Sequence, residues 1–135
     1  MEFDEYVKSR AYRTLKPLSQ YKQIDTNDLF GFQLSEGEGV IGIYENMPKE
    51  ANKDILITTR GLHFKNNQQQ GIFVSYDEIK SVEVLQPKEI ANILTLHLDS
   101  GRDVELIING KSGRFHDMWE FMRYVLRVVE FPRKS

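Results

Sequence analysis

The chain has 135 residues, a hydrophobic content of 40%, a charged content of 28% and a formal net charge of −2, which is typical of one soluble globular domain. This charge provides no global basic field, so we expect no nucleic-acid partner. The absence of cysteine excludes disulfides, thiolate catalysis and cysteine-based zinc sites.

The sequence contains no apolar run of membrane-spanning length. Residues 1–5 carry neither the basic region nor the apolar region of a signal peptide. We therefore expect a cytoplasmic protein.

Residues 3–15 carry apolar side chains at helical spacing, and Pro17 disfavours continuation of a helix. The pattern predicts an N-terminal helix that packs on the domain. Its apolar contacts would be Phe3, Val7 and Leu15, with Lys8, Arg10 and Arg13 facing solvent. The alternative is a basic amphipathic helix that lies on a membrane, but the apolar stripe is narrow for that role.

Residues 19–35 are less regular. Leu29, Phe30, Phe32 and Leu34 are too apolar to be left in solvent, so we expect them to pack across an end or a face of the domain. The pattern fits either a short helix or an extra strand, and it does not decide between them.

Short runs rich in aliphatic and β-branched residues then follow one another with polar or glycine-containing turns between them, which predicts strands. Connections this short make neighbouring strands antiparallel. The runs number about seven. They are 40–45, 54–59, 62–65, 71–76, 79–85, 93–98 and 103–108.

The last predicted element is a helix that begins after Gly113 and ends before Pro132. Its apolar residues recur at helical spacing, and Trp119 and Met122 are expected to share a core with the strands. This single apolar face predicts a lid on the open end of a sheet structure. The domain organisation expected is an N-terminal segment over 1–35, the main domain over 36–130 and a tail over 131–135.

Two motifs carry a family resemblance. The first runs from Ile57-Thr58 through Arg60 and Leu62 to Phe64, and the second runs from Val74-Ser75-Tyr76 through Ile79 to Val82. Together with the strand-like stretch 38–44, they resemble bacterial pleckstrin-homology-like and GRAM-like domains. The resemblance implies an α+β protein, mainly β, with an antiparallel barrel of about seven strands capped by a C-terminal helix. This fold hosts lipid, peptide and protein binding alike, so it leaves the function open.

Candidate chemistry is sparse. His63, His97 and His116 have no metal-ligand spacing, and we interpret all three as surface imidazoles. Asp77-Glu78 is interpreted as a solvated turn. Because no nucleophile, base and oxyanion donor occur at motif spacing, we expect neither an enzyme nor a cofactor or metal.

Phosphoinositide-binding members of the resembled family gather basic residues on their first hairpin. The corresponding region here offers Lys49, Lys53 and Arg60, with Glu50 and Asp54 beside the lysines. These acids oppose phosphate, so only weak lipid binding is expected. Six residues are therefore candidates for lipid or partner contact: Lys8, Arg10, Arg13, Lys49, Lys53 and Arg60.

The leading functional hypothesis is a non-enzymatic binding module that recognises a protein partner, such as a small bacterial immunity or adaptor protein. The expected site is the groove between the C-terminal helix and the neighbouring strand edge, entered by a peptide strand or helix. The alternatives are a peripheral membrane module that binds anionic lipid through basic residues, and an uncharacterised enzyme.

Overall fold

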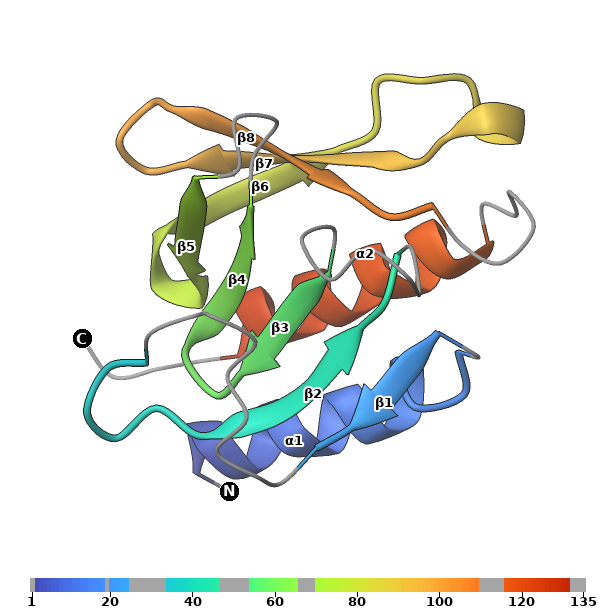
Figure 1. Ribbon diagram of the computed structural model, residues 1–135. Coiled ribbons are helices and arrows are strands. Elements are labelled where there is room, and N and C mark those ends of the chain that lie inside the picture. The colour runs from blue at the N-terminus through green and yellow to red at the C-terminus, as the bar shows by residue number, and fades with distance from the viewer. Residues whose placement is uncertain are drawn as a thin grey trace.

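The computed structural model describes residues 2–18, 20–24, 34–46, 54–65, 70–109 and 116–131 (Figure 1). This part of the chain forms two α-helices, eight strands and two short 3₁₀ helices. In chain order they are α1 (Phe3–Thr14), β1 (Tyr21–Gln23), β2 (Val40–Tyr44), β3 (Ile55–Thr58), β4 (Gly61–Lys65), β5 (Gly71–Ser75), η2 (Tyr76–Glu78), β6 (Ile79–Glu83), η3 (Lys88–Ile90), β7 (Ile93–Leu98), β8 (Asp103–Ile107) and α2 (His116–Glu130).

The strands form two antiparallel sheets. The larger, sheet A, has the order β1-β2-β3-β4-β5, and the smaller, sheet B, has the order β6-β7-β8. Within each sheet, every strand pairs antiparallel with its neighbour in the sequence, whereas the consecutive strands β5 and β6 belong to different sheets. The α+β class, the antiparallel pairing and the C-terminal helix are therefore confirmed.

The predicted antiparallel barrel of about seven strands is not found in the described residues, whose eight strands divide into two separate sheets. The division lies at η2, where the chain leaves sheet A. The Ser75 hydroxyl accepts a hydrogen bond from the Asp77 N–H at 3.2 Å, and the Tyr76 N–H donates to the Arg60 carbonyl at 3.0 Å. This turn sends β6 across the direction of β4 and β5 (Figure 1), so the ladder of sheet A ends at β5.

Strand β1 lies in the segment 19–35, for which the sequence pattern fitted either a short helix or an extra strand. Residues 21–23 form an extra strand at the edge of sheet A, where Tyr21 lies opposite Tyr44. Beyond it, Leu34 and Ile24 pack on Ile43 and Leu56, which form a small second core on the outer face of sheet A. The other apolar residues of this segment, Leu29, Phe30 and Phe32, lie outside the described residues.

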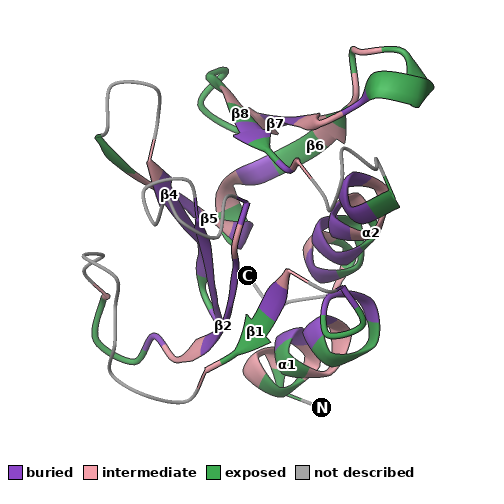
Figure 2. Cartoon of the chain, turned by 45° about the vertical axis from the view of Figure 1, so that its right-hand side comes forward, coloured by how far each residue is buried: buried purple, intermediate pink, exposed green. Residues whose placement is uncertain are grey.

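The main core lies between the two sheets and the helices, and Figure 2 shows the buried side of each helix turned inward. Helix α2 is held to the sheets by buried polar contacts as well as by packing. The Tyr44 hydroxyl donates to the Asp117 carboxylate at 2.7 Å. The Tyr76 hydroxyl donates to the Thr58 carbonyl at 2.9 Å and lies 2.7 Å from the Tyr124 hydroxyl. Burial raises the pKa of both tyrosines, so they stay neutral hydrogen-bonding groups.

The predicted core residues of β7, β8 and α2 belong to one cluster. Most of them are fully buried, while Val104, Trp119 and Met122 are half-buried at its border. Trp119 is thus a weaker core residue than its size suggested. Phe121 and Tyr124 are the fully buried aromatic side chains of α2. Phe121 makes edge-on contacts to Tyr44 at 5.9 Å and to Tyr124 at 6.1 Å between ring centroids.

Helix α1 packs mainly against α2. Val7 and Leu15 are buried as predicted, and Phe3 is half-buried against the core. Lys8 and Arg13 face solvent, but Arg10 is half-buried with an enclosed Nε, so its predicted outward position is only partly correct.

Replacement of Phe121 by alanine should lower the free energy of unfolding by about 3–5 kcal/mol, because it removes a fully buried ring from a packed core. Leu126→Ala on the solvent face of the same helix is the matched control and should cost less than about 1 kcal/mol. Urea unfolding of both variants measures the difference. Equal losses would show that α2 does not bury the face described here.

Candidate functional site

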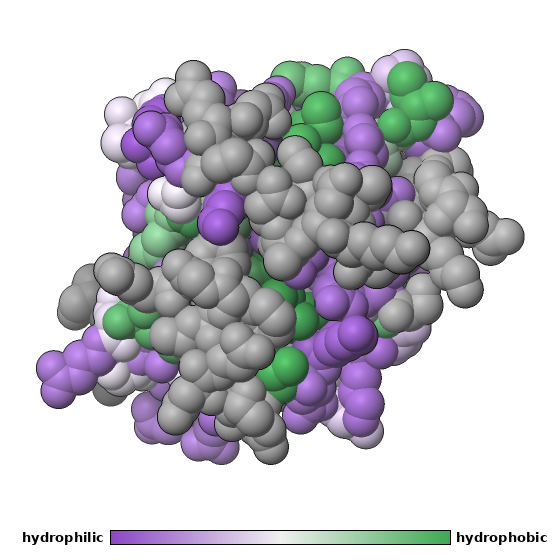
Figure 3. All heavy atoms as spheres, viewed as in Figure 1, coloured by the Kyte–Doolittle hydropathy of each residue, from purple (hydrophilic) through white to green (hydrophobic). Residues whose placement is uncertain are grey.

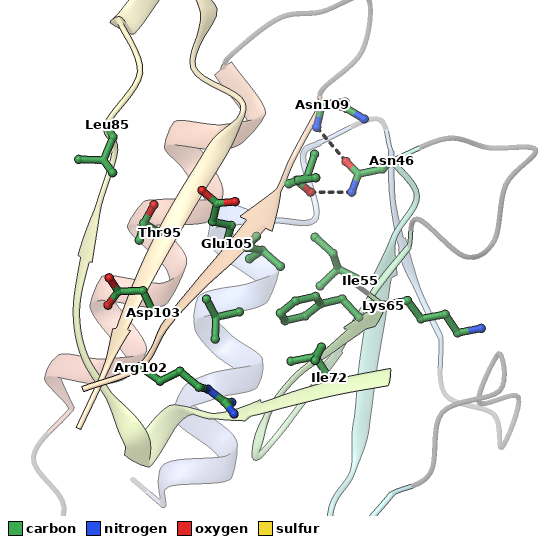
Figure 4. Close-up of a pocket in the computed structure, with 14 residues that line it drawn as sticks. Asn46, Ile55, Lys65, Ile72, Leu85, Thr95, Arg102, Asp103, Glu105 and Asn109 are labelled. Carbon is green, nitrogen blue, oxygen red and sulfur yellow. Dashed lines mark hydrogen bonds between the residues drawn. The ribbon is translucent and has the colours of Figure 1, made fainter. Parts of the chain in front are cut away.

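A groove opens between β8 and one end of sheet A. Its volume is about 600 Å³, which lies within the range of ligand and peptide pockets. Figure 4 shows Ile55 and Ile72 of sheet A on one side, and Asp103 and Glu105 of β8 on the other. The lining residues are Asn46, Ile55, Phe64, Lys65, Ile72, Leu85, Thr95, Arg102, Asp103, Val104, Glu105, Leu106, Ile107 and Asn109.

The groove lies elsewhere than the sequence predicted. The expected site lay between the C-terminal helix and a strand edge, whereas none of the lining residues belongs to α2. Helix α2 packs against β6, η2 and β7 instead. The groove is therefore a gap left where two sheets meet without forming a common ladder.

The side chains of β8 alternate as expected for a strand with one face in the core. Leu106 is buried and Val104 half-buried, and both face the main core. Asp103 and Glu105 are exposed, and so is Ile107, with 39% of its surface accessible. The groove thus combines an apolar floor with a charged outer row.

Among the described residues, one edge of β8 has no neighbouring strand, because β8 is the last strand of sheet B. The Arg102 carbonyl accepts from the Leu98 N–H at 2.9 Å, and the Ile108 N–H donates to the Asn92 carbonyl at 2.8 Å. Even-numbered residues therefore direct their backbone groups toward β7. By the alternation of an antiparallel ladder, Asp103 and Glu105 direct theirs away from it.

Asn46 closes one end of this free edge. Its side-chain amide donates to the Ile107 carbonyl at 2.7 Å, and its side-chain oxygen accepts from the Asn109 N–H at 2.8 Å (Figure 4). The side chain thus makes the two hydrogen bonds that a neighbouring strand would make. Among the described residues, the outward backbone groups of Asp103 and Glu105 have no such strand partner.

The outer face of sheet B carries an acidic row with one histidine. His97 lies 2.7 Å from an Asp103 oxygen and 2.8 Å from a Glu83 oxygen. The hydrogen bonds that the His97 ring makes to the carboxylates of Asp103 and Glu83 raise the pKa of His97, because both carboxylates favour the imidazolium. Glu105 is exposed beside them and takes part in no ion pair among the described residues. The row is therefore net acidic even when His97 is protonated.

Apolar side chains border the same sheet. Figure 3 shows hydrophobic surface in the region of sheet B and the loop after β6, where Leu85 and Ile90 are 69% and 64% exposed. Leu85 and Ile107 both line the groove. The groove mouth is therefore apolar next to the acidic row.

The predicted surface position of His63 is wrong, since this residue is only 5% exposed. Its Nε2 lies 2.7 Å from an oxygen of Glu38, and its ring lies 4.5 Å from that of Phe73. The alternation of β4 correctly placed His63 on the face opposite Leu62. That face is covered by the turn that carries Glu38, which comes from a distant part of the sequence.

Glu38 is the centre of a buried hydrogen-bond network. Its carboxylate accepts from the Thr58 hydroxyl, from the Ser35 N–H at 2.9 Å and from His63. Burial by itself raises the pKa of Glu38, but the three hydrogen bonds outweigh it and leave the pKa lowered. The Glu38 carboxylate accepts all of these hydrogen bonds and so holds the turn around residue 38 to the β3–β4 hairpin. This geometry provides no activated nucleophile.

A second buried carboxylate behaves in the opposite way. Asp54 is 3% exposed, and its Oδ1 has no hydrogen-bond partner among the described residues. Burial, together with the negative charge of Glu45, raises the pKa of Asp54 to about 6, although Lys22 lowers it in part. Lys22 itself is paired with Glu45 at 2.9 Å.

The other histidines follow the prediction more closely. His116 is exposed, and His97 lies at the surface within its carboxylate pair. In the described ranges, no group of three His, Asp or Glu side chains is arranged to hold a metal ion. Within those same ranges, no helix has the length and apolar character needed to span a membrane.

The candidate contact residues do not form one cluster. Arg60 lies 3.9 Å from Asp4 at the start of α1. Arg13 lies near the other end of that helix, and a rise of 1.5 Å per residue places it roughly 13 Å from Asp4 along the helix axis. Lys8 is exposed between them and Arg10 is half-buried. Lys49 and Lys53 lie outside the described residues. The described four belong to the α1 side of the molecule and do not line the groove.

Sequence reasoning missed the residues that form the groove. The alternation of β8 was recognised, but its edge position depends on which strands pair, which alternation does not reveal. Asn46 gave no signal at all, since an asparagine after a strand is an ordinary turn former.

No protein-family model matches the chain, and a search of curated proteins finds no similar sequence.

The Glu38 network predicts a specific pH dependence of stability. Because the folded-state pKa of Glu38 is lowered, its contribution is fully present above the ordinary value of 4.5 and is lost as the pH falls through the folded-state value. Glu38→Gln should therefore be less stable than the parent by about 1–3 kcal/mol at neutral pH. The difference should shrink as the pH is lowered below about 4.

Urea unfolding of both proteins at a series of pH values measures this. Glu36→Gln, on an exposed neighbour in the same turn, is the control and should leave the pH profile unchanged. Stability curves for Glu38→Gln and the parent that stay parallel down to acid pH would show that Glu38 is not held as a carboxylate.

Proposed function

We propose that the chain is a non-enzymatic binding module that recognises a protein partner through the groove beside β8. The observation that carries the proposal is the combination of an apolar groove and a strand edge with unpaired backbone groups. Strand edges of this kind bind extended peptides by adding them to the sheet, with pockets selecting alternate side chains.

The arrangement of elements supports a pleckstrin-homology-like or GRAM-like architecture. Strands β2 to β5 and β6 to β8 form groups of four and three, followed by α2 packed on the sheets. The motif tyrosine, Tyr76, is the buried residue whose hydroxyl meets Tyr124 of α2. A β-rich core with an additional strand and an additional N-terminal helix is consistent with a decorated member of that class.

The chemistry of the described residues supports binding over catalysis. The Glu38–His63 pair is enclosed and carries hydrogen bonds that hold a turn. The groove itself contains carboxylates, a lysine, an arginine and Thr95, but no histidine. A general base within reach of a nucleophile is the minimum for hydrolytic or transfer chemistry, and this set of side chains favours recognition instead.

One specific form of this proposal is that the chain is a small immunity or adaptor protein of the bacterial cytoplasm, which binds and blocks one partner protein. The support is the groove beside the β8 edge of sheet B. The lipid-binding alternative has less support, because the described basic candidates are dispersed along α1 and at Arg60.

A displayed library of random linear peptides tests the proposal. Selection on the parent protein should enrich peptides that bind in the groove. Ile72→Lys, at a half-buried position in the groove, should weaken the enriched peptides by roughly tenfold or more. Val129→Lys is the matched control, since Val129 is a half-buried aliphatic residue on α2, and it should leave binding unchanged.

Sedimentation with phosphatidylserine vesicles in about 0.15 M salt forms the second arm of the experiment. The proposal predicts little bound protein under these conditions. Failure to enrich any peptide, equal binding to both variants, or tight vesicle binding that depends on Lys8 and Arg13 would each overturn it.

A further inference from the structure

We propose that the segment bound by this groove is an extended strand in which basic and apolar side chains alternate, and that it pairs with the free edge of β8. This inference rests on the proposed function, because it takes the groove as the binding site. It adds the chemical class of the partner segment. Three features of β8 and its surroundings support this class: the backbone of the strand, the floor of the groove and the acidic row.

The first feature is the backbone. Asp103 and Glu105 direct their N–H and C=O groups away from β7, while Asn46 occupies the Ile107 carbonyl and the Asn109 N–H. A guest strand can therefore pair with the outward backbone groups of Asp103 and Glu105, which have no strand partner among the described residues. Beyond them, the Asn46 side chain already occupies the edge. About five guest residues at 3.4 Å each span roughly 17 Å, which is the length of β8 itself.

The second feature is the floor of the groove. Side chains of a paired guest strand point alternately to the two faces of sheet B. Those on the core-facing side lie beside Val104 and Leu106 and opposite Ile55 and Ile72. This environment selects aliphatic side chains, because a polar group there would lose water without gaining a hydrogen-bond partner.

The third feature is the acidic row. Guest side chains on the outer face become cross-strand neighbours of Asp103 and Glu105, at about 4.5–5.5 Å between Cβ atoms. Opposite charges at such positions stabilise pairing and like charges oppose it. On this outer face, Glu83, Asp103 and Glu105 exceed the one imidazole of His97 in charge. The two cations that line the groove belong elsewhere, because Arg102 follows the alternation of Val104 and Leu106 and Lys65 lies on β4. Lysine or arginine therefore fits the outer face of the guest.

The same charges disfavour a second copy of this chain as the occupant. Two β8 strands paired about Glu105 would place Glu105 opposite its own copy, and pairing about Val104 would place Asp103 opposite Glu105. Pairing about Leu106 would need the Ile107 and Asn109 groups that Asn46 already holds. Charged residues on an edge strand are a common protection against self-pairing, and here they leave room for a basic guest.

The test uses four acetylated and amidated peptides of about seven residues, the length that covers β8 with one residue at each end. They alternate valine with lysine, valine with glutamate, and valine with threonine. The fourth is the lysine peptide with N-methyl groups on alternate residues, which removes the N–H groups of one edge. Fluorescence anisotropy gives the affinities, and amide chemical shifts give the location.

The lysine peptide should bind tightest, shift the amides of Asp103 and Glu105, and lose binding on N-methylation. Glu105→Lys should weaken the lysine peptide roughly fivefold and strengthen the glutamate peptide, because one cross-strand attraction becomes a repulsion. Glu5→Lys, which makes the same charge change at an exposed position on α1, is the control and should leave both affinities unchanged.

Two failures are distinguishable. If the threonine or glutamate peptide binds the groove as tightly as the lysine peptide, the basic preference is wrong and the groove remains the binding site. If no peptide shifts the groove amides and the random library also yields none, the proposed function fails as well. Shifts of the Asp103 and Glu105 amides that depend on protein concentration alone would show self-pairing and overturn the inference. Should Glu105→Lys fail to fold, the ranking of the peptides on the parent protein decides the matter.

Discussion

The unpaired edge of β8 is the constraint on which the functional account depends. A strand edge presents backbone donors and acceptors that must bind water, a side chain or another strand. Asn46 satisfies two of these groups at one end of β8, and the turn at η2 prevents the two sheets from joining into one ladder. The result is an edge that stays open next to an apolar floor. A closed barrel would have removed both the edge and the groove.

The rest of the molecule holds that edge in place. Sheet B contacts α2 through β6 and β7. Helix α2 is tied to sheet A by the Tyr44–Asp117 hydrogen bond and to η2 by the Tyr76–Tyr124 hydrogen bond. Helix α1 lies on the other side of α2 and encloses the core. Opposite this packed side, β8 runs across the end of sheet A, where the lining of the groove changes from buried aliphatic residues to exposed charge. In the described residues, the architecture thus separates a tightly packed side from a strand edge without a strand partner.

Much of the fold could be predicted because it is local. Alternation located β2 through β8, Gly101 marked the hairpin turn with its positive φ of 90°, and helical spacing located α1 and α2. The failures share a physical cause, which is that alternation assigns side chains to a face but does not reveal what covers it. His63 was placed on the correct face and is nevertheless buried under Glu38. Trp119, expected in the core from its helical spacing, packs at the border of the core, whereas Phe121 of the same helix is fully buried. The groove depends on which strands fail to pair, and no local pattern encodes that.

Amide hydrogen exchange of β8 in the free protein tests the central claim most directly, because it requires no partner. The Val104 and Leu106 N–H groups face β7 and should exchange slowly. The Asp103 and Glu105 N–H groups face outward and should exchange much faster, which gives an alternating pattern along one strand. Equally slow exchange at all four residues would show that the outer edge of β8 is already paired, and it would contradict the account of the groove as an open binding edge.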